Sequence, residues 1–199
     1  MTSIHRRPDI KNIPRNTPRM HYAKVKGADE ARITWMHLGD YQNNLFRMLM
    51  HNSTCAGHLS ELLHSLTASV TLPPYLRELS ILSTCHIRDI RYVWTKHYPV
   101  ALGCGVSTKQ LASLRKGHVH STDLWSDEDR SLIRFTEEQL KTGRVSDATF
   151  EQIQKHLDER QIVELIILIG SYALIGDVLE ITMVQSEKRG LSEAESTPR

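Results

Sequence analysis

Side chains suited to proton-transfer chemistry lie close together in the middle of the chain. The carboxylate of Glu78 follows Arg77, the imidazole of His97 comes nineteen residues after Glu78, and the aromatic rings of Tyr92 and Trp94 precede His97. A carboxylate beside an imidazole makes a general acid/base, because the carboxylate fixes the ring tautomer and favours the protonated ring. We therefore expect Glu78 and His97 to be catalytic.

Two predicted helices must position this pair. The first begins near Pro73 and Pro74, where proline suits the start of a helix. Asp89 is expected to cap the second helix. Residues recur at helical spacing in both helices: Leu76, Leu79, Ile81 and Leu82 in the first, and Ile90, Val93, Trp94 and His97 on one face of the second. If the helices fold back on each other, the carboxylate and the imidazole lie at the same end of the hairpin.

The same residues resemble the signature of the carboxymuconolactone decarboxylase and alkyl hydroperoxidase D-like proteins. That signature consists of Arg-Glu at the start of a helix, Tyr-x-Trp, a histidine and Gly-Val-Ser, as at Arg77-Glu78, Tyr92-x-Trp94, His97 and Gly105-Val106-Ser107. Segments 44–52 and 146–172 also resemble the family's first helix and closing helix pair, so the likeness covers residues 40–185. It implies an all-α, alkyl hydroperoxidase D-like helical bundle.

Two departures from the family narrow the expected activity. Ile90 and Val93 stand where the peroxidase branch has the two cysteines that reduce a peroxide, so thiol redox chemistry is not expected. Arg91 and Val93 flank the tyrosine where the decarboxylase branch commonly has acidic residues. The resemblance therefore implies the decarboxylase-like branch, without the redox CxxC, and a substrate other than that branch's usual lactone.

Further residues of this stretch are predicted to bind the substrate. Arg77 suits a substrate carboxylate or enolate oxygen, because its guanidinium fork matches paired oxygens; the alternative is a surface salt bridge. Trp94 shares a helix face with His97 and is either a pocket wall or a core tryptophan. The remaining candidates are Tyr92, as a hydrogen-bond donor, and Cys85 and His86 at the end of the first helix.

No cofactor, metal ion or nucleic acid is expected as a partner. The eleven histidines show no spacing typical of a metal site. Glu164, in an apolar segment, matches a residue usual in the family and is expected to be structural and hydrogen-bonded. A net charge of +2 gives no electrostatic case for nucleic acid.

The chain has the size and composition of one folded domain. It has 199 residues, 40% of them apolar, which suffices for one core. Cys55, Cys85 and Cys104 form no CxxC pair, which fits a reducing compartment, and neither a signal peptide nor a membrane-length apolar run is visible. We expect a cytoplasmic protein with a basic extended arm (1–32), a helical domain (33–186) and a charged tail (187–199).

Helix signals continue on both sides of the central pair, and no segment alternates as a strand does. Helices are expected from Asp40 to about Met50, across Leu59 to Leu66, from Ser107 to Leu114, from Ser126 to Lys141 with a stop at Gly143, from Ser146 onward, and from Asp158 to about Ser186.

The run from Ile162 to Ile175 is apolar on nearly all sides and must be covered. In the resembling family such surfaces are buried in trimers or paired trimers, which implies an obligate homo-oligomer here, a trimer or hexamer. The basic arm is either a partly disordered tail or an arm that wraps a neighbouring subunit or closes the pocket.

The leading interpretation is a cofactor-independent lyase or isomerase that acts on a small carboxylate or lactone of specialised metabolism. His97 would move a proton next to a carbonyl or lactone, Glu78 would orient His97, and Arg77 would stabilise negative charge. One alternative is a catalytically inactive, oligomeric binding or scaffold protein of the same fold. The third is a peroxidase-type oxidoreductase, against which the missing cysteine pair argues.

Overall fold

Helix α4, Pro74–Arg88, lies at the centre of an all-helical structure. The computed structural model describes residues 17–24, 43–119 and 123–187, and no strand occurs within these ranges. The elements around α4 are α2 (Asn44–Leu49), the 3-10 helix η2 (Met50–Asn52), α3 (Ser53–Ala68), α5 (Arg91–Gly103), α6 (Thr108–Arg115), α7 (Asp127–Thr142), α8 (Asp147–Ile153) and α9 (Glu159–Thr182). The predicted fold class, all-α, is confirmed for the described residues.

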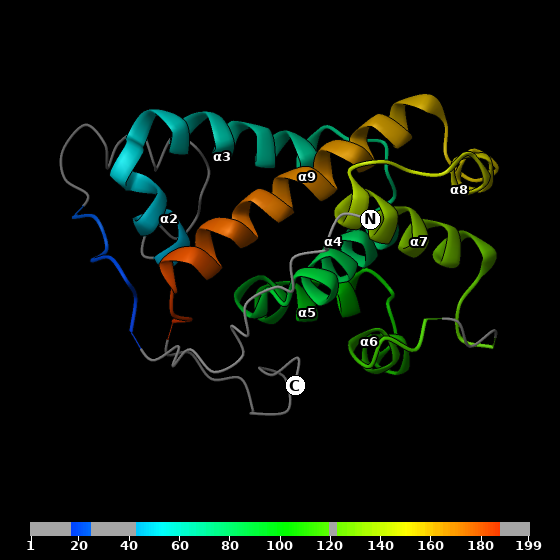
Figure 1. Cartoon of the computed structure of the whole chain (residues 1–199), viewed down its shortest axis with the longest axis horizontal. Helices are drawn as coiled ribbons and strands as arrows, with labels where there is room; N and C mark the ends of the chain where they lie inside the picture. The colour runs from blue at the N-terminus through cyan, green and yellow to red at the C-terminus, as the bar shows by residue number, and fades with distance from the viewer. Residues whose placement is uncertain (1–16, 25–42, 120–122, 188–199) are drawn as a thin grey trace, which may run out of the picture.

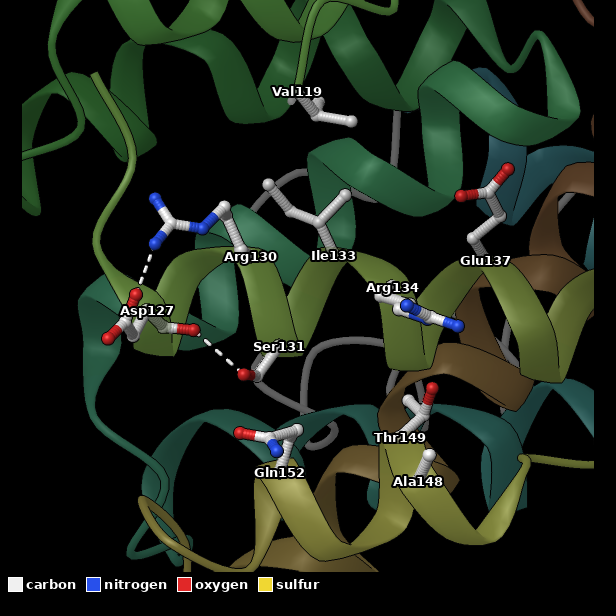
Figure 2. Close-up of a pocket in the computed structure, with 10 residues that line it drawn as sticks. All are labelled: Val119, Asp127, Arg130, Ser131, Ile133, Arg134, Glu137, Ala148, Thr149 and Gln152. Atoms are coloured by element: carbon white, nitrogen blue, oxygen red, sulfur yellow. Dashed lines mark hydrogen bonds and ion pairs between the residues drawn. The ribbon is translucent and has the colours of Figure 1, made fainter. Parts of the chain in front are cut away.

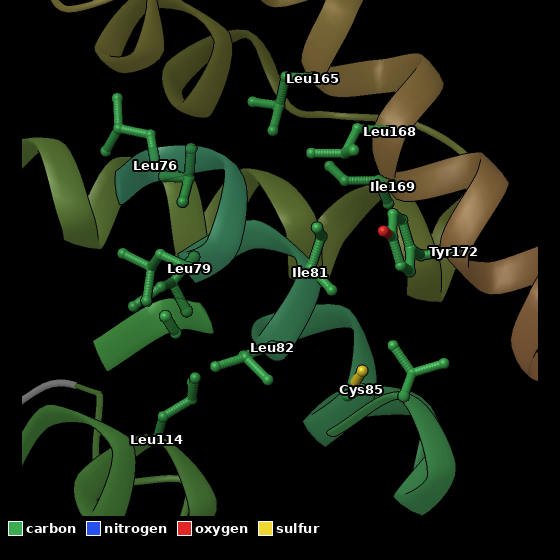
Figure 3. Close-up of a cluster of buried hydrophobic side chains, with 14 of the residues drawn as sticks. Leu76, Leu79, Ile81, Leu82, Cys85, Leu114, Leu165, Leu168, Ile169 and Tyr172 are labelled. Carbon is green, nitrogen blue, oxygen red and sulfur yellow. The ribbon is translucent and has the colours of Figure 1, made fainter. Parts of the chain in front are cut away.

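Helix α4 is covered on several sides by other helices. It packs against α9, α7 and α5, and nine of its fifteen residues are buried. Figure 3 shows its leucines and Ile81 meeting side chains of α9, among them Leu165, Leu168 and Tyr172, with Leu114 of α6 beyond. A helix buried on most of its circumference is held rigidly by packing. Any side chain near its start is therefore well positioned.

Helix α9 crosses the bundle diagonally (Figure 1) and contacts α3, α4 and α7. It is long and apolar enough to cross a membrane, but half of the residues in its most apolar 18-residue stretch are buried within the fold. The opposite face of α9 is exposed and also apolar, at Val163, Ile166, Ile167, Leu174 and Ile181.

Most predicted helix boundaries are confirmed. Ser107, Ser126, Ser146 and Asp158 cap α6, α7, α8 and α9 through their side-chain oxygens, and Gly143 ends α7 in the left-handed region at φ 70°. A cap of this kind satisfies a backbone N–H that the helix itself leaves unpaired.

Three predicted boundaries are wrong. Asp89 does not cap α5; it ends α4 in the left-handed region at φ 55°, a conformation that aspartate tolerates, and Ile90 precedes α5 without a side-chain cap. Asn43, not Asp40, caps α2, while Asp40 itself lies outside the described residues. Helix α9 ends at Thr182, before the predicted end at Ser186, because Met183 adopts the left-handed conformation at φ 57°.

The described parts of the arm and tail lie against the helical domain. Residues 17–24 contain no helix, and the backbone of Ala23 donates to the Arg47 carbonyl at 3.0 Å. At the other end, Glu187 accepts a hydrogen bond from the Asn44 backbone at 2.6 Å. The rest of the predicted arm and of the predicted tail lies outside the described residues.

The turn into α5 packs directly on α9. A Cβ added at Gly176 of α9 would lie 2.2 Å from Ile90 Cδ1 and 2.7 Å from Ile90 Cγ1. Real Cβ atoms essentially never approach so closely, so only glycine allows this contact between the two segments without movement. By contrast, a Cβ added at Gly170 of the same helix would meet nothing within 4 Å.

We therefore predict opposite effects for alanine at the two glycines. Gly176→Ala should lower the free energy of unfolding by about 1–3 kcal/mol, as overpacking does, whereas Gly170→Ala should raise it by about 0.5–1 kcal/mol through helix propensity. Urea denaturation of both variants measures this difference. Ile90→Val, which removes Cδ1, should restore part of the loss in Gly176→Ala; equal stability of the two alanine variants would contradict the contact.

Candidate active site

The structure brings Glu78 and His97 together between α4 and α5. His97 Nδ1 lies 2.8 Å from Glu78 Oε2, within hydrogen-bond distance. The left-handed residue Asp89 reverses the chain after α4, so α5 runs back along it and returns His97 to the level of Glu78. The predicted meeting of the two side chains at one end of a helical hairpin is confirmed; their catalytic roles stay predictions.

The carboxylate is buried and the imidazole is partly open. Glu78 is 2% exposed, whereas the side chain of His97 is 21% exposed. Arg77 Nε lies 3.6 Å from Glu78 Oε1 and is itself buried, without a hydrogen-bond partner among the described residues. A buried carboxyl group requires such polar and charged partners. Arg77 is therefore ion-paired with Glu78, and its role in binding a substrate stays a prediction.

Tyr172 of α9 is a third member of this site, which sequence reasoning missed. Its hydroxyl lies 3.2 Å from His97 Nε2, and the two rings meet edge to face with centroids 5.2 Å apart. The signal that could have revealed it is its position: on the inward face of α9, between Ile169 and Ile175, it is a polar group in an otherwise apolar row. A buried tyrosine hydroxyl normally has a hydrogen-bond partner.

The protonation of Tyr172 sets the direction of the hydrogen bonds. Burial first, then the nearby Glu78 carboxylate, raise the pKa of Tyr172 well above its usual value, so the hydroxyl keeps its hydrogen at neutral pH. When the ring of His97 is neutral, that O–H can donate only to Nε2, so the ring hydrogen is on Nδ1, where it is donated to Glu78. The three side chains form one chain of hydrogen bonds from α9 through α5 to α4.

Tyr92 does not belong to this cluster. Its hydroxyl lies 2.5 Å from Asn43 Oδ1 and 2.6 Å from Glu187 Oε1, and it can donate its one hydrogen to either oxygen. Lys96 Nζ also forms an ion pair with Glu187 at 2.6 Å. These contacts tie α5 to the start of α2 and to the last described residues. The prediction that Tyr92 binds substrate beside His97 gains no support, because its polar end is directed elsewhere.

The other three predicted binding residues, Trp94, Cys85 and His86, each have different surroundings. Trp94 is buried in the core, 6.5 Å from the Tyr98 ring between centroids, which favours the core alternative. Cys85 is fully buried two turns after Glu78; burial first, then the Glu78 charge, raise the pKa of its thiol, so it stays protonated and is a poor nucleophile. His86 lines a separate cavity of about 260 Å³ with Gly117 and Lys141.

A larger hollow, of about 490 Å³, lies between α7 and α8 (Figure 2), and contains none of the predicted site residues. Its charged side chains are satisfied within the chain: Arg130 pairs with Asp127, and Arg134 donates to Glu138 at 3.0 Å. Its size alone therefore gives no reason to place the chemistry there, and the acid/base pair remains the stronger candidate.

Two further findings concern polar residues outside this cluster. No group of three or more histidine, cysteine, aspartate or glutamate side chains in residues 17–24, 43–119 and 123–187 is placed to hold a metal ion. Glu164 accepts hydrogen bonds at 2.9 Å from the backbones of Thr71 and Leu72 and from Arg160, so its predicted structural role is confirmed.

Comparison with known proteins shows the fold. No family model matches the chain, and no curated protein matches it. Among solved structures, an uncharacterized peroxidase-related protein from Silicibacter sp. TM1040 is 12% identical, with a TM-score of 0.71, over 86% of this chain and 92% of that one.

Two further structures are similar. The debrominase Bmp8, solved as a variant in complex with 2,3,4-tribromopyrrole, has a TM-score of 0.69 at 12% identity, over 85% of this chain and 92% of its own. A protein of unknown function from Agrobacterium tumefaciens, described as a putative antioxidant defence protein AhpD, has a TM-score of 0.56 at 15% identity, over 66% and 90%. The chain therefore has the helical fold of AhpD-like and peroxidase-related proteins.

Proposed function

We propose that this protein is a cofactor-independent enzyme that performs general acid/base chemistry on a small molecule, as a lyase or isomerase acting next to a carbonyl or lactone. One observation carries the proposal: a nearly fully buried carboxylate holds an imidazole at 2.8 Å while part of that imidazole stays open to solvent. Core packing alone has no need of such an arrangement, and proton transfer does.

A decarboxylation illustrates what these residues can do. The C–C bond to the substrate carboxylate breaks, carbon dioxide leaves, and the electron pair moves into the conjugated carbonyl to give a dienolate. His97 supplies the proton that quenches the dienolate and regains it from solvent, Glu78 keeps the ring oriented, and the guanidinium of Arg77 stabilises the negative oxygen. Isomerisation or ring closure uses the same groups, because each passes through an enolate.

The substrate we propose is a small unsaturated or aromatic acid of specialised metabolism. The Bmp8 debrominase, solved in complex with 2,3,4-tribromopyrrole, is an enzyme of this fold that binds a small aromatic ring. The guanidinium of Arg77, whose Nε lies 3.6 Å from Glu78 Oε1, places a positive charge beside the acid/base pair and so favours a substrate with an anionic oxygen. A polyketide-like or aromatic carboxylic acid combines both features.

A peroxidase-type activity is the weaker alternative despite the peroxidase-related neighbours. All three cysteines are free, and Cys85, on the same helix as Glu78, is buried with a raised thiol pKa. Ile90 and Val93, at the positions where the resembling peroxidase branch has its dithiol, are buried core residues. Thiolate attack on a peroxide requires an accessible, low-pKa cysteine, which Cys85 is not.

Turnover of a substrate panel tests the proposal. Carboxylated lactones, β-keto acids and aromatic polyketide acids are incubated with wild type, His97→Ala and Glu78→Gln, and products are identified by mass spectrometry. We expect a product lighter by carbon dioxide, or of unchanged mass for an isomerase, formed at least about 100-fold more slowly by His97→Ala, the lower range for loss of a general acid/base. Tyr98→Phe, a neighbouring substitution on α5, serves as the control.

Equal turnover by wild type and His97→Ala would contradict the proposal. No turnover of any panel member, with the variants folded like wild type, would favour the second interpretation, a binding or scaffold protein of the same fold.

We further propose that the protein assembles as a homo-oligomer, with the outer face of α9 as the contact, and that it acts in the cytoplasm. Val163, Ile167, Leu174 and Ile181 recur at steps of four or seven residues along this face and are between 40% and 64% exposed. Such a row suits packing against another helix. In the obligate homo-oligomer that the family resemblance implies, a second copy of the chain covers this row.

Light scattering during size-exclusion chromatography tests the assembly. Wild type should have a mass that is a multiple of 22.8 kDa, the mass of one chain, and Leu174→Gln should have a smaller mass. Phe150→Gln changes a similarly exposed apolar residue on α8 and should behave as wild type. A wild-type mass of a single chain would contradict the proposal.

A further inference from the structure

Both ring nitrogens of His97 are occupied by groups of the same chain. Nδ1 lies 2.8 Å from Glu78 Oε2, and Nε2 lies 3.2 Å from the hydroxyl of Tyr172. A neutral imidazole has one donor and one acceptor, and this arrangement uses both. His97 therefore presents no free nitrogen to a substrate unless Tyr172 is displaced.

We infer that Tyr172 is the group that contacts the substrate, through a hydrogen bond from its hydroxyl to the oxygen on which negative charge develops, with His97 acting on the substrate through Tyr172. This inference rests on the proposed function and assigns a substrate class to it: a conjugated carbonyl compound whose oxygen becomes an enolate. Tyr172 belongs to α9, whereas the acid/base pair belongs to α4 and α5, so the site is formed by three helices.

The Tyr172 hydroxyl is buried and held in place, and both features strengthen a hydrogen bond to a developing negative charge. Tyr172 is 8% exposed and its ring is held in the core cluster (Figure 3), so a hydrogen bond from it acts in a medium of low polarity. Electrostatic interactions are stronger there than in water, and a donor that is already fixed costs no reorganisation during the reaction. The edge-to-face contact with His97 keeps the hydroxyl close to Nε2.

A decarboxylation through Tyr172 moves two protons, one from His97 to Tyr172 and one from Tyr172 to the substrate. The cycle begins when His97 takes up a second proton on Nε2; that Nε2–H is then donated to the Tyr172 oxygen, which frees the Tyr172 hydrogen for donation to the substrate carbonyl oxygen. The C–C bond breaks, carbon dioxide leaves, and the electron pair moves to that oxygen. The Tyr172 proton is transferred to the oxygen, giving an enol, while the Nε2 proton restores the tyrosine hydroxyl. Solvent then reprotonates His97, so one proton is consumed for each carbon dioxide.

The high pKa of Tyr172 fits a relay. Because burial and the Glu78 charge disfavour tyrosinate, the hydroxyl does not accumulate in its ionised form; it passes one proton on as it receives another. Glu78 compensates the positive charge of the protonated ring throughout the cycle. The residue that sequence reasoning placed first in the reaction thus becomes a positioning and proton-supplying residue behind the tyrosine.

Binding of 3,4-dinitrophenol tests this assignment without knowledge of the substrate. The phenolate oxygen of this probe stands in for the enolate oxygen, and its absorbance reports ionisation on binding. We expect wild type to bind it as phenolate, and Tyr172→Phe to bind it about 10- to 100-fold more weakly, the range for losing a hydrogen bond to a charged group. Tyr98→Phe removes a hydroxyl from the neighbouring residue of His97 and should bind as wild type does.

His97 is tested by the pH dependence of the same binding. If it acts through Tyr172, His97→Gln should bind the probe with a dependence on pH that no longer includes an imidazole ionisation. Unchanged probe affinity in Tyr172→Phe, or no binding by wild type, overturns the assignment of Tyr172. Failure of the proposed function is distinguished by turnover: loss in His97→Ala with full activity in Tyr172→Phe refutes only the tyrosine, whereas full activity in both refutes the acid/base function itself.

Discussion

The hydrogen bond between the buried Glu78 and His97 is the interaction on which the rest of the site depends. A carboxyl group that is 2% exposed is stable only with partners, and the structure supplies His97 from α5 and Arg77 beside it. Holding these partners requires α5 to fold back on α4. It also requires α9 to lie close, which the Gly176 contact with Ile90 allows.

The sequence predicted the helical hairpin because helical spacing shows which residues share a face. It predicted the capped starts of α6 to α9 because a serine or aspartate before the first helical residue is a local pattern. It failed where the answer depends on a partner far along the chain. Tyr172 comes 75 residues after His97, and nothing local shows that their helices cross there. Tyr92 was misplaced for the same reason, since its partners Asn43 and Glu187 are 49 residues before it and 95 residues after it in the sequence.

The same fold is shared with a debrominase and with peroxidase-related proteins, so the fold does not decide the chemistry. Two positions at the start of α5 distinguish this chain from the resembling peroxidases: Ile90, which precedes the helix, and Val93. Ile90 and Val93 fill core space where the resembling peroxidases have a dithiol, and Ile90 also packs on Gly176. A thiol could not be reintroduced at Ile90 without changing this packing. What remains polar in this part of the bundle is a chain of proton-transfer groups.

The most direct test of this account is the tautomer of His97, read from nitrogen-15 NMR of its ring at a pH where the imidazole is neutral. The account predicts the hydrogen on Nδ1, donated to Glu78, with Nε2 accepting from Tyr172. A hydrogen on Nε2 of the neutral ring would contradict it, because Nδ1 would then have no hydrogen to donate to Glu78 and Glu78 would no longer orient the ring.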